Sequence, residues 1–117
     1  MDPVDMREHQ TRAARMESFF REVNERIASM LDPLHAEHPT VEQTWVCECC
    51  AGSCTDWVSL SLQEYERVRS DGTWFFIAPA HHDPLVEQVL ERTDRYWLVE
   101  KIEEAAEITR GTNPRQR

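Results

Sequence analysis

Apolar residues recur every three or four positions between Thr11 and Leu31, and this spacing predicts an amphipathic helix. The helix is expected to stop at Asp32, because Pro33 disfavours the helical conformation of the residue before it. Residues 1–10 are expected to form a flexible N-terminus. The apolar stripe of this helix comprises Met16, Phe19, Phe20, Val23, Ile27, Met30 and Leu31.

Four later segments have the composition of β-strands. Residues 42–48 and 55–61 are expected to pair as a hairpin whose tip carries the cysteines, since apolar and polar residues alternate in the second of them. Residues 74–78 are apolar on both faces, which predicts a central strand that is covered on both sides. Residues 95–102 complete a four-stranded sheet.

Sequence patterns typical of helix starts lie between these predicted strands. Ser61 and Glu64 form an S-x-x-E capping box, so a helix is expected to follow Ser61. Asp83 is a good N-cap residue and Pro84 a good first-turn residue, which predicts another helix through residue 92. A short helix or turn is expected at residues 103–109.

These elements predict an α+β fold with a small, mostly antiparallel four-stranded sheet, an N-terminal amphipathic helix and two further helices. A single domain is expected over residues 11–109, followed by a flexible basic tail at 110–117. The length of 117 residues suits one domain.

The net charge and the N-terminal sequence limit the partners and the cellular location that are expected for this protein. A formal net charge of -9 disfavours binding to nucleic acid or to anionic membranes, and the basic tail is the main feature that would support a nucleic-acid-binding regulator. The first residues lack the apolar region of a signal peptide, and no apolar run reaches membrane-spanning length. A reducing, cytoplasmic location is therefore expected, where clustered cysteines more often bind metal or act in redox chemistry than form structural disulfides.

All four cysteines lie between residues 47 and 54. Cys47, Cys49 and Cys54 form a C-x-C-x4-C pattern around a tight turn, which favours a zinc site that closes the hairpin tip. Cys50 is a poorer ligand candidate, because adjacent residues on an extended chain point in opposite directions. The fourth ligand is expected from elsewhere in the chain, with His81 and His82 as the best candidates.

Two other functions of the thiols stay open. In a redox-responsive switch, oxidation would expel the metal; Cys47 or Cys49 could then bridge to Cys54, and Cys50 would be the reactive spare thiol. Catalysis is disfavoured, because three thiolates make zinc a weak Lewis acid and the motifs of zinc deaminases and zinc proteases are absent.

Three stretches form a recognisable series: "VCEC…C…W-V-x-L-S-L-x-E-Y-E-x-V-R", "F-x-I-A-P-A-H-x-D-P-x-V-E-x-V-x-E-R-x-D-R-Y-W-L-V-E-K" and "E-A-A-E-I". With them the chain resembles, from about Arg21 to Ile108, a family of small actinobacterial proteins of unknown function. The resemblance implies Cys47, Cys49, Cys54 and His81 as the ligand set. Cys50 stands where that family usually has glycine or alanine, and Ala80 replaces the glycine before His81.

The choice of His81 has a structural consequence. The strands at residues 55–61 and 74–78 must run antiparallel for His81 to reach the cysteines, because a right-handed parallel crossover would leave it at the opposite end of the sheet.

The expected function is that of a small zinc-binding, protein-interaction or regulatory module. Its partner would be another protein or a second copy of the chain. Phe19 and Phe20 are candidate partner-binding residues because they point about 100° apart on the helix, which leaves one of them surplus to the core. Trp45 and Trp57 flank the cysteines, where they would either shield the metal or bind a partner.

Overall fold

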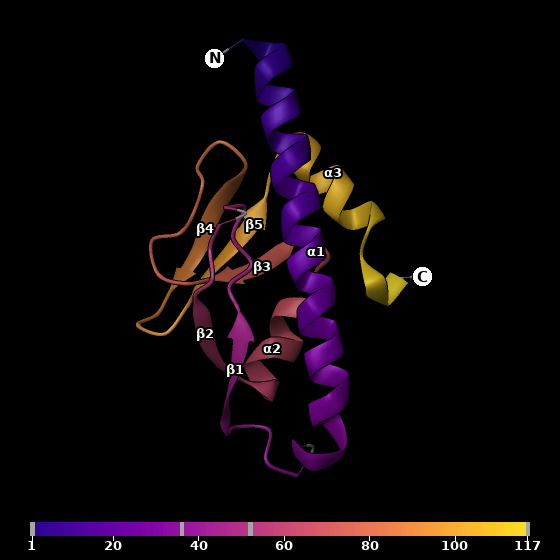
Figure 1. Cartoon of the computed structure of the whole chain (residues 1–117), viewed down its shortest axis with the longest axis vertical. Helices are drawn as coiled ribbons and strands as arrows, with labels where there is room; N and C mark the ends of the chain where they lie inside the picture. Colours follow the sequence, from indigo (N-terminus) through magenta and orange to yellow (C-terminus); the bar gives the residue numbers. More distant parts are fainter. Residues whose placement is uncertain (1, 36, 52, 117) are drawn as a thin grey trace.

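The structure, a computed structural model, describes residues 2–35, 37–51 and 53–116, and leaves out the side chains of residues 32–35 and 116. A long N-terminal helix packs along a body of strands and short helices (Figure 1). The elements in chain order are α1 (Pro3–His35), β1 (Glu42–Val46), β2 (Trp57–Ser61), α2 (Leu62–Arg69), β3 (Trp74–Ile77), β4 (Glu87–Arg92), β5 (Trp97–Lys101), α3 (Glu103–Gly111) and a 3-10 turn, η1 (Pro114–Gln116).

The fold is α+β as predicted, but the described strands form two antiparallel sheets rather than one four-stranded sheet. One sheet is the β1–β2 hairpin, with Trp45 opposite Val58. The other has the order β3-β5-β4, with Phe75 opposite Val99. β3 therefore lies at an edge of its ladder instead of the predicted centre, although the prediction that it is covered is confirmed by the buried Phe75, Phe76 and Ile77.

The predicted helix at 83–92 is wrong, because residues 87–92 form strand β4. The Asp83 side chain accepts the Leu85 N–H at 3.0 Å, and its carbonyl accepts the N–H groups of Val86 and Glu87, both at 3.1 Å, so its capping signal is used for a single turn. The chain then extends along β5, with Glu87 opposite Lys101. This pairing buries the Glu87 carboxylate against the Lys101 ammonium, which also contacts Glu17 of α1. The long-range ion cluster outweighs the local helix signal.

Helix α1 differs from its predicted bounds at both ends. It begins at Pro3, so residues 3–10 of the predicted flexible start are helical, and it continues past Pro33 to His35. A proline two residues before a helix end removes only one backbone hydrogen bond, which explains why it does not end α1 earlier. At the other terminus, Arg115 of the predicted flexible tail forms ion pairs with Glu25 at 2.7 Å and Glu66 at 2.6 Å.

The buried face of α1 is also different from the predicted apolar stripe. It consists mainly of small and polar residues at helical spacing: Gln10, Ala13, Ala14, Glu17, Ser18, Arg21, Asn24 and Ala28. Each charged member has a partner from a distant segment: Arg21, for example, donates to the Gly72 carbonyl at 2.6 Å and the Thr109 carbonyl at 2.9 Å. In contrast, Phe19 and Met30 of the predicted apolar stripe are 61% and 68% exposed.

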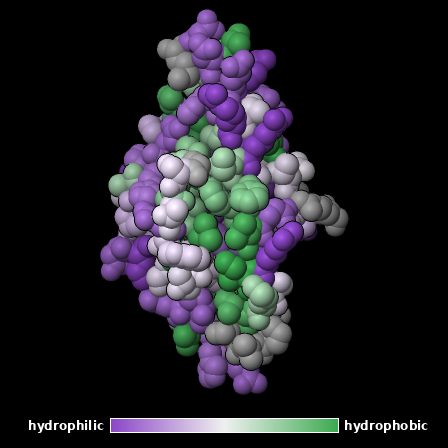
Figure 2. Space-filling model, viewed as in Figure 1, coloured by the Kyte–Doolittle hydropathy of each residue, from purple (hydrophilic) through white to green (hydrophobic). Residues whose placement is uncertain are grey.

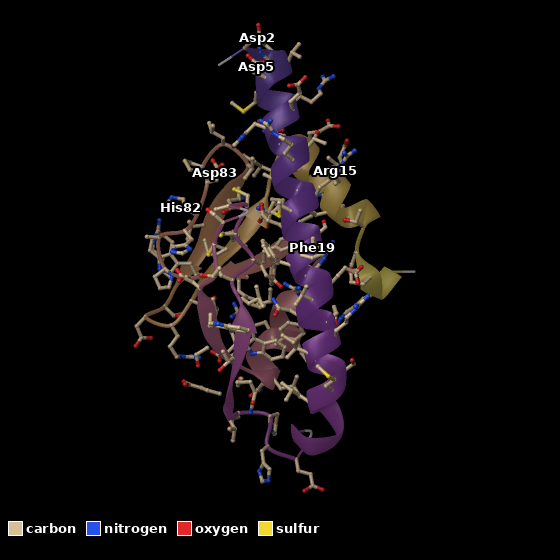
Figure 3. The ribbon with its side chains drawn as sticks, viewed as in Figure 1. Asp2, Asp5, Arg15, Phe19, His82 and Asp83 are labelled. Atoms are coloured by element: carbon tan, nitrogen blue, oxygen red, sulfur yellow. The ribbon has the colours of Figure 1, made fainter. Side chains whose placement is uncertain are left out.

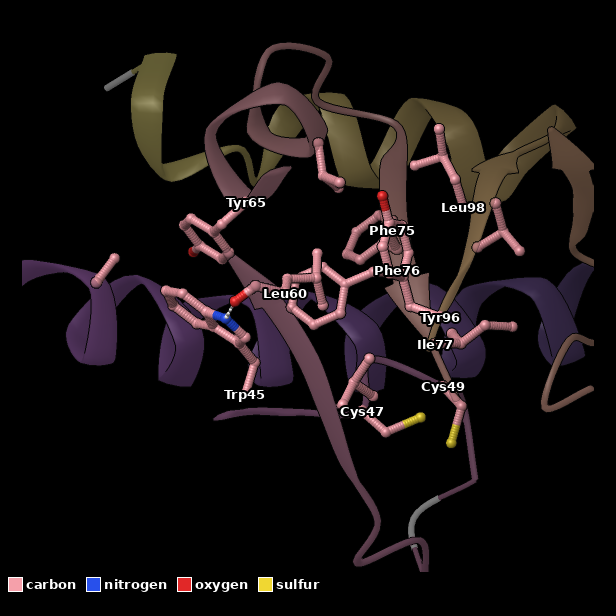
Figure 4. Packing of buried hydrophobic residues seen from close by; sticks show 14 of the residues in the cluster. Trp45, Cys47, Cys49, Leu60, Tyr65, Phe75, Phe76, Ile77, Tyr96 and Leu98 are labelled. Carbon is pink, nitrogen blue, oxygen red and sulfur yellow. Dashed lines mark hydrogen bonds between the residues drawn. The ribbon is translucent and has the colours of Figure 1, made fainter. Parts of the chain in front are cut away.

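The main core lies between α1, α2 and the two sheets (Figure 4). Trp45 is fully buried there; its ring stacks on Tyr65 with centroids 4.1 Å apart, and its Nε1–H donates to the Leu60 carbonyl. The prediction that Trp45 contributes to a partner-binding surface is therefore wrong. The cysteine pair Cys47 and Cys49 lies at one end of this core.

Candidate metal centre

Four soft or borderline donors converge beyond the tip of the β1–β2 hairpin. The ligand atoms of Cys47, Cys49, Cys54 and His81 all lie within 4.8 Å of one another. The His81 Nδ1 atom is 3.7 Å from Cys47 Sγ and 3.6 Å from Cys54 Sγ. A tetrahedral zinc with Zn–S of about 2.3 Å and Zn–N of about 2.0 Å places sulfur and nitrogen about 3.5 Å apart. The four residues are thus close enough to bind one metal ion.

The backbone holds two of these ligands in place. The Cys47 N–H donates to the Asp56 carbonyl at 3.1 Å, which extends the hairpin by one residue beyond β1. The Cys47 Sγ accepts the N–H of Ala78, the residue that follows β3, at 3.2 Å. His81 lies on the turn after Ala78 and donates its N–H to that residue's carbonyl at 3.1 Å. One short turn therefore brings the histidine to the sulfur atoms.

The His81 turn requires an unusual backbone conformation. Ala80 has a φ of 70°, in the left-handed region that glycine adopts readily and alanine rarely. The alanine found at this position is therefore strained.

The described strands β2 and β3 lie in different sheets, so the predicted four-stranded sheet in which they would run antiparallel does not form. The cysteines reach His81 by another route: the Glu48 N–H, just beyond β1, donates to the Phe76 carbonyl of β3 at 3.1 Å. The segment that carries Cys47 and Cys49 thus runs alongside β3 although β1 itself pairs with β2.

Glu48 anchors this segment from the side opposite to the sulfur atoms. Because side chains alternate along an extended chain, Glu48 points away from its cysteine neighbours and into the core, where it is fully buried. Its carboxylate accepts two hydrogen bonds from Arg69, at 2.5 and 2.9 Å, and one from Asn24 Nδ2 at 2.8 Å. The main-chain N–H of Phe76 adds a fourth contact at 3.3 Å. This carboxylate is therefore occupied and faces away from the metal ligands.

The outer ring nitrogen of His81 faces a carboxylate. Nε2 lies 3.2 Å from Asp56 Oδ2, while Nδ1 faces the cysteines. Metal-binding histidines commonly donate their second N–H to a carboxylate, which fixes the ring orientation and makes the ligand nitrogen more basic. The sequence shows Asp56 only as one of several acids near the cysteines, because nothing in the spacing indicates that it faces His81.

The thiols influence one another. A hydrogen bond from Cys47 lowers the pKa of Cys49 to about 5, and the same bond together with burial raises the pKa of Cys47. Burial also raises the pKa of Cys54. Removal of all three protons without a cation would therefore place three negative sulfur atoms in one partly buried space, so metal binding must displace protons.

Cys50 and His82 lie outside this ligand group. The Cys50 thiol points to Asp83 Oδ2 at 3.6 Å, and the same oxygen is 2.7 Å from His9 Nε2. Burial and nearby carboxylates raise the pKa of Cys50 to about 12, which works against the reactive role predicted for it. The His82 ring packs against Trp97 instead (5.4 Å between centroids), on the loop where Figure 3 labels His82 and Asp83.

The other three predicted partner-binding residues differ in how much of the side chain is exposed to solvent. Phe19 and Trp57 are 61% and 63% exposed, while Phe20 is half-buried and makes an edge-to-face contact with Phe19. Phe19 lies on α1 and Trp57 begins β2, next to Asp56 of the metal centre.

No model of a known protein family matches this chain, and no curated protein or solved structure matches it either. The resemblance to small actinobacterial proteins therefore stays a prediction. Within the described part of the chain, no helix is both long and apolar enough to cross a membrane.

Proposed function

We propose that this protein is a small, cytoplasmic zinc-binding module that binds other protein surfaces, and that its zinc is structural. The observation that carries the zinc assignment is the convergence of three cysteine sulfurs and one histidine nitrogen within 4.8 Å. Zinc suits such a set, because it prefers four tetrahedral sulfur and nitrogen ligands.

A structural role fits this site better than a catalytic one. Four protein ligands would fill a tetrahedral zinc, whereas catalytic zinc keeps one position for water or substrate. Glu48, the carboxylate nearest in sequence to the ligands, is held by Arg69 and faces the core. Asp56 faces the outer nitrogen of His81. Neither acid is placed to serve as a general base at the metal.

The positions of the four ligands in the fold explain how zinc would stabilise the folded state. Cys47, Cys49 and Cys54 belong to the β1–β2 hairpin and its tip, and His81 belongs to the loop between β3 and β4. Zinc would join the two sheets covalently at this point, and that link adds to folding stability because an unfolded chain offers no assembled site. The resulting rigid body would present Phe19 and Trp57 to partners.

Native mass spectrometry with metal analysis tests the zinc site, and the chain supplies its own control. We expect one zinc per chain, lost in Cys54→Ser and His81→Ala together with thermal stability. Cys50→Ser lies in the same loop outside the ligand group, so it should keep the zinc. Metal-free purified protein that is fully folded, or zinc loss in Cys50→Ser alone, would refute the assignment.

A redox-responsive version of the same site is a second candidate function. It is favoured by the close approach of three thiols, which places potential disulfide partners together. Mild peroxide would then release zinc and form one disulfide between two of the ligand cysteines. Zinc retention with intact thiols under that treatment would exclude the switch.

A further inference from the structure

Helix α1 contacts the chain segments that carry the metal ligands at two places along its length. The first is Asn24, which pairs with the backbone of Val46, the residue before Cys47. The Val46 N–H donates to Asn24 Oδ1 and Asn24 Nδ2 donates to the Val46 carbonyl, both at 2.9 Å. Asn24 Nδ2 also donates to Glu48 Oε2 at 2.8 Å. Asn24 is fully buried, so these contacts fix the cysteine segment against the helix.

Fifteen residues earlier in the helix, α1 holds the loop that carries His81. The His9 Nε2 atom lies 2.7 Å from Asp83 Oδ2, and Gln10 Nε2 donates to the Leu85 carbonyl at 3.0 Å. Gln10 is 3% exposed, so its amide contact is shielded from solvent. At a rise of about 1.5 Å per residue, the two contact points are about 22 Å apart along the helix. One helix therefore holds both ligand-bearing segments.

The cysteine segment turns alternate side chains towards the metal site and towards α1. Glu48 lies between two ligand cysteines in the sequence but contacts Asn24 of the helix. Cys50 follows a ligand cysteine and packs against the cluster that contains Ala13 and Ala14 of α1. The helix thus supports this segment from the side opposite to its sulfur ligands.

Large apolar side chains contribute little to the docking of α1. Phe19 and Met30 are 61% and 68% exposed, and Figure 2 shows a hydrophobic band along the lower half of the helix. The buried face of α1 consists mainly of small and polar residues. Because small residues bury little apolar area, the position of this helix depends on its polar contacts with other segments.

We propose that zinc binding and the docking of α1 are coupled, so that loss of zinc loosens α1 where it contacts the ligand-bearing segments. Zinc fixes the cysteine segment and the His81 loop relative to each other, and α1 holds the same two segments. Each therefore removes part of the freedom that the other must otherwise remove, and the coupling is reciprocal. The middle of α1 stays docked, because Arg21 donates to the carbonyls of Gly72 and Thr109, which belong to neither segment.

This inference rests on the zinc site proposed above, and the two fail in different ways. Native mass spectrometry measures whether zinc is bound, and hydrogen exchange measures whether α1 responds to it. A protein that binds no zinc would overturn both proposals. A protein that binds one zinc per chain without any change in α1 would overturn the coupling alone.

The first test compares amide hydrogen exchange in the zinc-loaded and the chelator-treated full chain. We expect residues 9–14 and 24–31 of α1 to exchange at least about 5-fold faster without zinc, while residues 17–22 keep their protection. Unchanged exchange at residues 9–14 and 24–31, or an equal loss of protection along the whole helix, would overturn the coupling.

The second test measures the reciprocal effect as the zinc dissociation constant, by chelator competition. Gln10→Ala removes the contact with the Leu85 carbonyl and should raise this constant at least about 5-fold. His9→Ala, at a side chain that is 30% exposed, should act in the same direction and serves as the test if Gln10→Ala does not fold. Ser18→Ala is the matched control, because Ser18 lies on the buried face of α1 but pairs with Thr112 at 2.9 Å, outside the ligand-bearing segments. Wild-type affinity in both test variants, or an equal loss in Ser18→Ala, would refute the coupling.

Discussion

Replacement of Arg69 by methionine should destabilise this protein more than any surface change of the same kind. The substitution keeps most of the apolar stem and removes the guanidinium, which is the main partner of the buried Glu48 carboxylate. Arg69 and Glu48 side chains are 2% and 0% exposed, and two hydrogen bonds join them at 2.5 and 2.9 Å. Asn24 and the Phe76 N–H would remain as partners, so the carboxylate would be left only partly compensated.

The magnitude follows from breaking a buried ion pair on one side. Such losses are about 3–5 kcal/mol, because a charge stays in a low-dielectric core without its counter-ion. A chain of 117 residues has a free energy of unfolding of roughly 6–17 kcal/mol. With a urea dependence of about 1.5 kcal/mol per molar, the unfolding midpoint should fall by about 2–3 M.

Arg67, two residues before Arg69 in the same helix, provides the control. Arg67 pairs with Glu91 at 2.6 Å, but the two side chains are 50% and 37% exposed. Arg67→Met should therefore cost at most about 1 kcal/mol, since solvent screens exposed pairs and hydrates the charge left behind. Urea unfolding of both zinc-loaded variants, followed by tryptophan fluorescence, measures the difference. Equal midpoint shifts for Arg69→Met and Arg67→Met would refute the reasoning.

The metal gives this prediction a second readout. Glu48 lies between Cys47 and Cys49 in the sequence and fixes the segment that carries both sulfur atoms. A loosened Glu48 should therefore weaken zinc binding in Arg69→Met, measured by competition with a chelator. Arg67→Met should bind zinc as the wild type does, because its exposed ion pair joins α2 to β4 and includes no residue of the hairpin tip.

Three further substitutions have defined expected outcomes. Ala80→Gly should raise the free energy of unfolding by about 0.5–1 kcal/mol because it relieves a φ of 70°, and a lower melting temperature would contradict this. Asp56→Asn should weaken zinc affinity about 10-fold in chelator competition without unfolding the chain, because it weakens the carboxylate contact to His81; unchanged affinity would show that this contact does not orient the ring. Lys101→Met should cost about 3–5 kcal/mol at pH 7, since it leaves the buried Glu17 without its cation. Burial raises the folded-state pKa of Glu17 above 4.5, so this cost should shrink as the pH falls from 7 to 5 and the carboxylate takes up a proton; a cost independent of pH would argue against a charge effect.

Several features of this protein could be predicted from neighbouring residues alone. The S-x-x-E box at Ser61 forms as expected, with both reciprocal hydrogen bonds present, because its partners are three residues apart. The close spacing of Cys47, Cys49 and Cys54 likewise indicated a metal site, since one turn can gather them. For the histidine, position after an apolar strand left both His81 and His82 open, and the resemblance to the small actinobacterial proteins favoured His81, which is the member of the pair that lies in the four-residue group.

Other features depended on contacts between distant segments. Residues 87–92 became a strand because Glu87 pairs with Lys101, 14 positions away, and Lys101 also pairs with Glu17, 70 positions from Glu87; no local pattern shows that cluster. Arg21 and Asn24 became core residues of α1 because their partners come from the far end of the chain and from β1. Met16, Phe19 and Met30 of the same helix were thereby turned to solvent. Spacing along a chain shows which residues can share a face, whereas the burial of a charged face depends on counter-charges that only the tertiary fold brings near.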